Sequence, residues 1–160
     1  MMNYLERIDK YYFLFIALLT IVFVSYSGSY IIEYIAGEDT LNIDFFNDKS
    51  LLYIFIFTVI VGPIIETLIF QFGIIELILL LKKNKFFEIL AILISSIIFG
   101  LTHNYNVYYI IFGVFIGIIF GIIYIVAKRR KDMNAFTIVL IAHAFTNLIA
   151  FFHNDVFKLG

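Results

Sequence analysis

Among the few strongly polar side chains within the apolar stretches of this 160-residue chain, four could carry chemistry: Glu66, His103, His143 and Asn147. One carboxyl group, two imidazoles and one amide can together activate a water molecule and stabilise an oxyanion. Glu66 stands in GPIIETLIFQF, inside the apolar run from Leu51 to Leu81, where a charge would have to leave water for hydrocarbon. His143 and Asn147 are four residues apart and therefore share one face of a helix. The pattern predicts a hydrolytic type of site assembled from three separate segments.

Each of these side chains also has a structural explanation. A buried carboxyl group can be protonated and hydrogen-bond to a neighbouring helix, and each histidine can do the same. Ionisable residues within a bilayer nevertheless usually face the interior of the helix bundle and mark functional sites. The structural explanation has to account for four such side chains together, which favours chemistry.

The composition is that of an integral membrane protein, with 63% hydrophobic residues, 14% charged residues and a mean hydropathy of +1.04. A hydrocarbon core of about 30 Å needs roughly 20 helical residues, so helices are expected to span it. The absence of cysteine excludes disulfides, thiolate catalysis and cysteine-ligated zinc. The net charge of −1 gives no indication of a nucleic-acid partner.

Five apolar segments are predicted to cross the membrane, at residues 11–30, 51–81, 86–104, 107–127 and 135–152. The N-terminal residues and the connections KKNK and KRRKDMN are basic, whereas AGEDTLNIDFFNDKS is acidic. The positive-inside rule then places the N-terminus inside and the C-terminus outside. We expect an all-α, polytopic bundle in which residues 1–160 form one domain. The abundance of Ile, Phe, Tyr, Asn and Lys is typical of an A/T-rich genome and indicates a bacterial cell membrane.

The segment 51–81 is longer than one crossing requires and contains Pro63. If Pro63 divided it into two crossings, both basic connections would lie outside, so one crossing is expected, either tilted, bent at Pro63 or protruding. The first segment is read as a retained helix, because no A-x-A cleavage site follows it. In the fourth segment Gly113, Gly117 and Gly121 share one face and are expected to allow close helix packing.

His103 and Glu66 are predicted to lie at different depths in the membrane. His103 ends the third segment near the outside, whereas Glu66 lies fifteen residues, or about 22 Å, from Leu51. They can meet only if the start of the segment 51–81 projects outward or if the turn HNYN dips into the bundle. Glu76 and Glu88 are expected to lie at the interface and to extend toward KKNK. Tyrosines near the segment ends, Tyr109 among them, are assigned to the interfacial belts.

GPIIETLIFQF, FGLTH and HAFTN resemble, in order, the EExxxR, FxxxH and HxxxN motifs of the CPBP family of intramembrane proteases. This family includes the CAAX prenyl endopeptidases and the bacteriocin-processing or immunity proteins (Abi). Glu66 matches the first acid, Phe99 and His103 the second motif, and His143 and Asn147 the third. The resemblance covers residues 62–147.

Two positions depart from the family motif: Thr67 replaces its second acid and Gln71 its arginine. Both replacements are neutral, so the charge balance is kept. The two residues are four apart, and a hydrogen bond between Thr67 and Gln71 is our hypothesis for what replaces the ion pair of the family.

The resemblance implies hydrolysis of a peptide bond inside the membrane, without a covalent intermediate. Glu66 would take a proton from water oriented by His103, and His143 and Asn147 would bind the oxyanion. The family is often described as metalloproteases, and Glu66, His103 and His143 could instead ligate zinc. We favour the carboxylate-activated water, because Glu66 would otherwise be both ligand and base. Ser95 and Ser96 have no motif support as nucleophiles.

Two other classes of function stay open at this stage. The missing acid and arginine favour a non-catalytic relative, acting as a bacteriocin immunity factor or a peptide-binding membrane protein. In an unrelated transporter, Glu66 would carry a proton or a cation. The short connections favour a small peptide, a leader peptide or a lipidated C-terminus as substrate, with membrane lipids as the other partners. The sequence gives no indication of the oligomeric state.

Overall fold

The computed structural model describes residues 2–37, 40–41 and 48–157. These residues form only helices and the turns between them, which confirms the predicted all-α class. In chain order the elements are α1 (Met2–Leu5), α2 (Lys10–Ala36), α3 (Leu51–Phe55), η2 (Ile56–Val61), α4 (Gly62–Glu66), η3 (Thr67–Ile74), α5 (Ile75–Leu81), α6 (Lys85–Thr102), α7 (Val107–Arg130), α8 (Ala135–Phe151) and η4 (Phe152–Val156).

Five helical segments of the described chain are long and apolar enough to cross a membrane. They are Lys10–Ala36, Leu51–Leu81, Lys85–Thr102, Val107–Arg130 and Ala135–Val156, so the five predicted segments are confirmed. The first and the last extend beyond their predicted ends at residues 30 and 152. The assignment of the N-terminus to the inside stays a prediction, and much of the acidic connection on which it partly rests lies outside the described residues.

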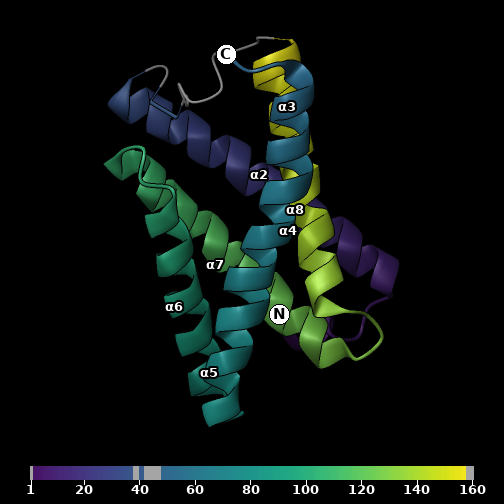
Figure 1. The fold of residues 1–160 in the computed structure, drawn as a ribbon. Coiled ribbons are helices and arrows are strands. Elements are labelled where there is room, and N and C mark those ends of the chain that lie inside the picture. The colour runs from purple at the N-terminus through teal and green to yellow at the C-terminus, as the bar shows by residue number, and fades with distance from the viewer. Residues whose placement is uncertain (1, 38–39, 42–47, 158–160) are drawn as a thin grey trace.

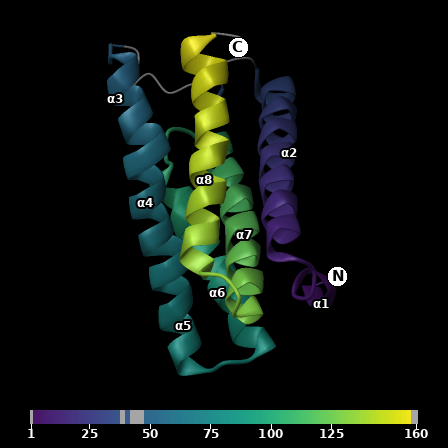
Figure 2. The same ribbon diagram turned by 90° about the vertical axis from the view of Figure 1, so that its right-hand side faces the viewer.

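Helix α7 has the largest buried share of the five segments and packs against α2, α6 and α8 (Figures 1 and 2). Its glycine row faces α6 and allows the close helix packing that the sequence predicts. A Cβ atom on Gly113 would lie 3.0 Å from the Cα atom of Gly100, and one on Gly117 would lie 2.9 Å from the Cα atom of Ser96. The two backbones are therefore in direct contact, which a larger side chain would prevent.

The segment Leu51–Leu81 is one uninterrupted helix that alternates between α- and π-helical hydrogen bonding. Two π-helical stretches, η2 and η3, flank α4. At the end of η2 the amide of Gly62 bonds to the carbonyl of Phe57, five residues earlier. Pro63 follows at the start of α4, where its fixed φ angle suits a helix. Pro63 does not divide the segment, in agreement with the single crossing expected.

Glu66 and His103 lie at similar distances from the turn that joins α5 to α6, and therefore at a similar depth in the bundle. Glu66 lies fifteen residues before Leu81 and His103 eighteen residues after Lys85, which gives about 22 and 27 Å at helical rise. The α3 end of the long segment extends beyond the turn between α6 and α7 (Figures 1 and 2). Of the two arrangements expected, the structure thus has the projecting one.

The projecting end of the long segment, formed by α3 and η2, has its own small apolar cluster. Ile54 and Val59 pack with Phe151 of α8, and the rings of Phe55 and Phe151 meet edge to face at 5.5 Å. This cluster holds the α3–η2 stretch against the end of α8 and so fixes the direction in which the helix approaches the site.

Ion pairs tie the opposite end of the bundle together. Glu76 accepts from Lys128 at 2.5 Å, while Arg129 bonds to both Glu88 and Glu6. The expectation that Glu76 and Glu88 extend toward the KKNK turn is therefore incomplete. Their hydrogen-bond partners are on α7, because the last turn of that helix brings its basic side chains between α1, α5 and α6.

Candidate active site

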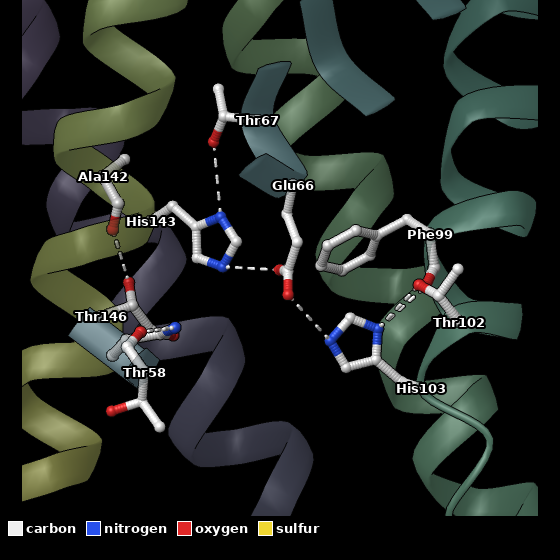
Figure 3. A network of polar contacts seen from close by, with 10 residues as sticks. Thr58, Glu66, Thr67, Phe99, Thr102, His103, Ala142, His143 and Thr146 are labelled. Atoms are coloured by element: carbon white, nitrogen blue, oxygen red, sulfur yellow. Dashed lines mark hydrogen bonds and ion pairs between the residues drawn. The ribbon is translucent and has the colours of Figure 1, made fainter. Parts of the chain in front are cut away.

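The structure brings Glu66, His103 and His143 together from three helices (Figure 3). Glu66 ends α4, His103 follows the last residue of α6, and His143 lies in the middle of α8. Nε2 of His143 is 3.4 Å from Oε2 of Glu66, and Nε2 of His103 is 3.9 Å from Oε1. The two imidazoles therefore face the two oxygens of one carboxyl group.

A backbone contact decides which nitrogen of neutral His103 carries hydrogen. Nδ1 lies 2.8 Å from the carbonyl oxygen of Phe99, which can only accept. Nδ1 must therefore donate, and the Nε2 that faces Glu66 has a free lone pair. Phe99 also places its ring 4.6 Å from the imidazole. The four-residue spacing in FGLTH thus positions His103 through the main chain as well as through the ring.

The second imidazole lies in a closed environment. His143 is 4% exposed, and the ring of Phe120 packs on it at 4.6 Å. Its Nδ1 is 3.5 Å from Oγ1 of Thr67. When Glu66 is ionised it only accepts, so Nε2 of His143 carries the hydrogen and Nδ1 accepts from the Thr67 hydroxyl. The two histidines consequently present opposite functions to Glu66: His143 a donor and His103 an acceptor.

The hydrogen bond expected between Thr67 and Gln71 is absent, so this part of the sequence interpretation was wrong. Both side chains are fully buried, but Thr67 faces His143, and Nε2 and Oε1 of Gln71 have no hydrogen-bond partner in the described structure. Thr67 instead pairs with His143, an imidazole of the neighbouring helix α8, and so is not available to Gln71.

Asn147 lies one turn beyond His143 on α8, as its spacing predicts, yet its observed partner is a backbone group. Its Nδ2 donates to the carbonyl oxygen of Thr58 at 2.8 Å. An amide nitrogen has two hydrogens, and this bond uses one of them. The oxyanion-binding role that the resemblance implies for Asn147 stays a prediction.

Tyr109 is a further residue of the site that the sequence did not reveal. It was assigned to the interfacial belt, but its half-buried ring stacks on His103, with centroids 6.0 Å apart and planes inclined by 7°. Asn106 caps α7 by accepting from the amide of Tyr109 at 2.9 Å, which places the ring in the first turn. The cap could have been recognised in HNYN, although the ring contact could not.

The exposure of the three central side chains differs in a way that suits catalysis. The side chains of Glu66 and His103 are 28% and 21% exposed, whereas that of His143 is 5% exposed. Glu66 and His103 therefore lie at the surface of the bundle. His143 is held from within by Thr67 and Phe120.

Two alternatives from the sequence find no support in this geometry. Ser95 donates to the carbonyl oxygen of Phe70 and Ser96 to that of Ile92, so neither hydroxyl is directed at a base. For zinc, no group of three or more His, Asp or Glu side chains within the described residues is arranged to hold a metal ion.

Comparison with known proteins identifies one matching family. A family model described as Rce1-like, type II CAAX prenyl endopeptidase, matches residues 48–149. The match covers more than half of the chain and includes Glu66, His103, His143 and Asn147. No curated protein and no solved structure matches the chain.

Proposed function

Because the chain belongs to the Rce1-like family of type II CAAX prenyl endopeptidases, we propose that it is an intramembrane endopeptidase in which Glu66 and His103 activate water. The observation that carries this proposal is that a carboxyl oxygen and the unprotonated nitrogen of an imidazole lie 3.9 Å apart at a partly exposed position. Both groups are acceptors, and a water molecule has two hydrogens to donate.

The separation suits a single bridging water. Hydrogen bonds of about 2.8 Å from one water oxygen to two acceptors span roughly 4 to 4.5 Å, close to the distance observed. In the reaction, the water oxygen forms a bond to the carbonyl carbon of the peptide while its proton passes to Glu66. The electrons of the carbonyl double bond move to its oxygen. When the tetrahedral intermediate collapses, the C–N bond breaks and Glu66 returns the proton to the leaving amine.

His143 is the proposed donor to the developing oxyanion. The ionised Glu66 carboxylate, 3.4 Å away, favours the hydrogen on Nε2, and the Thr67 hydroxyl can donate to the free Nδ1 of that tautomer. A carboxylate at position 67 would accept from Nδ1–H and would favour the other tautomer. Thr67 thus supports the site by a different bond from the one a second acid would make. The second amide hydrogen of Asn147 completes the proposed oxyanion site.

A peptide or a prenylated protein is the substrate class that the family suggests. We propose a small peptide, a leader peptide or a lipidated C-terminus, since the described connections between the helices are short. A non-catalytic role as an immunity or peptide-binding protein is the second candidate. The replacement of the motif acid and arginine by Thr67 and Gln71 favours it.

Mass spectrometry of membrane peptides tests the proposal. Native protein is compared with Glu66→Gln and His103→Gln at equal membrane levels, with Glu76→Gln as a control that removes a carboxylate from the same helical segment far from the site. We expect peptides that the native and control proteins release to be missing in both site variants. Identical profiles from all four folded proteins would support the non-catalytic candidate. If a chelator abolished peptide release and added zinc restored it, the chemistry would instead be metal-dependent.

A further inference from the structure

Asn147 makes an unusual contact between two membrane-spanning helices. Its Nδ2 donates to the main-chain carbonyl of Thr58, which lies in η2. Main-chain carbonyls of a spanning helix normally pair within their own helix, because hydrocarbon offers no other partner. The reversed amide orientation would place Oδ1 against the carbonyl oxygen, so the donor assignment is clear.

Pro63 explains why this carbonyl needs an outside donor. The amide of Gly62 bonds to Phe57, five residues earlier. The next bond of the same pattern would run from residue 63 to the carbonyl of Thr58. Proline has no N–H, so that bond cannot form. The side chain of Asn147 supplies the missing donor at 2.8 Å.

The position of this bond matters because it lies just before Glu66. The π-helical stretch ends at Val61, and α4 carries Glu66 three residues after Pro63. An additional residue in a helical turn rotates all later side chains by about 100° around the helix axis. The hydrogen-bonding pattern around Thr58 and Pro63 therefore determines whether Glu66 faces His143 and His103.

We propose that Asn147 is a positioning residue for Glu66: it replaces the N–H that Pro63 lacks and so maintains the π-helical register before α4. The bond also fixes the amide plane and hence the direction of its second N–H. This assignment rests on the proposed function in so far as Glu66 reacts with substrate, but the structural link can be measured without any substrate.

A double-mutant cycle tests the link. Asn147→Leu removes the donor at similar volume, and Pro63→Ala supplies a main-chain N–H to Thr58. We expect Asn147→Leu to lower the melting temperature in detergent by roughly 3 °C, and Pro63→Ala to recover at least half of that loss in the double variant. Ser95→Ala provides the matched control, since it removes a side-chain bond to the carbonyl of Phe70, where no proline intervenes. The change in melting temperature caused by Ser95→Ala should add to the change caused by Pro63→Ala.

Activity and spectroscopy distinguish positioning from direct chemistry. With a farnesylated peptide in proteoliposomes, kcat should fall about 100-fold in Asn147→Leu and recover about tenfold or more when Pro63→Ala is added. The ring ¹⁵N resonances of His143, which sense Glu66, should shift in Asn147→Leu and return in the double variant. A residue that served only to bind the oxyanion would show no recovery of kcat.

The proposal is overturned if the stability effects of Asn147→Leu and Pro63→Ala simply add and the histidine resonances do not return. If Asn147→Leu fails to accumulate in membranes, the double variant should accumulate, and its absence would also overturn the proposal. If the native protein cleaves no peptide, the proposed function fails, while the stability cycle and the resonances still decide the role of Asn147.

Discussion

Gly100→Ala should separate α6 from α7 and thereby disturb the site without touching its polar residues. A Cβ atom at Gly100 would lie 2.7 Å from both the carbonyl oxygen of Ile110 and the amide nitrogen of Val114. Both are backbone atoms, which cannot rotate away. His103 lies three residues later, on the end of the same helix.

The size of the expected loss in stability and kcat follows from the short distances between the added Cβ atom and the backbone of α7. Reaching an ordinary contact of about 3.5 Å requires the two backbones to separate by roughly 0.5 Å or more. Overpacking of this kind costs about 1–3 kcal/mol of stability, partly offset by about 1 kcal/mol from the better helix propensity of alanine. A movement of His103 by a fraction of an ångström to 1 Å should lower kcat about 10- to 100-fold, because the bridging water needs both acceptors in place.

Gly121→Ala, on the α7 side of the same contact between α6 and α7, is the matched control. Its Cβ atom would meet the side chain of Ile92, at 3.0 Å from Cγ2 and 3.3 Å from Cγ1. A side-chain end can move, so the helices need not separate. We expect its kcat to stay within about threefold of the native value, because the Ile92 side chain can rotate and α6 need not move away from α7.

The assay combines cleavage of a farnesylated peptide in proteoliposomes with thermal unfolding in detergent. The reasoning is refuted if Gly100→Ala and Gly121→Ala have the same kcat and the same melting temperature. That result would mean that the contact between α6 and α7 does not determine the position of His103.

Three further predictions follow from individual contacts. Thr67→Val should shift the ¹⁵N resonances of His143 toward the other tautomer and lower kcat about tenfold, whereas Thr67→Ser should restore both; unchanged resonances in Thr67→Val would contradict the tautomer assignment. Gln71→Met should leave the melting temperature unchanged or raise it, because the buried amide has no partner to lose; a large fall would show that the amide is bonded in the membrane. Arg130→Met should expose α1 to proteolysis, since the buried guanidinium donates to the carbonyls of Leu5 and Ile8; protection equal to the native protein would argue against this attachment.

The sequence alone determined the architecture and most of the chemical groups of the site. Hydropathy is a local property, so five apolar segments could be recognised without knowing their neighbours. The order of the three motifs likewise identified Glu66, His103 and His143, and the spacing HAFTN placed Asn147 beside His143 on one helical face.

Only the tertiary structure decided how these groups are paired. The bond expected from Thr67 to Gln71 is not made because Thr67 pairs with His143 of α8, and a contact between two helices cannot be foreseen from one segment. The acceptor role of His103 depends on the carbonyl of Phe99 within one helix, but the donor role of His143 depends on Thr67 from another. The bond from Asn147 to Thr58 joins residues that are far apart in sequence. Hydrogen-bond partners of this kind are set by how helices dock, and docking is a property of the whole bundle rather than of any one segment.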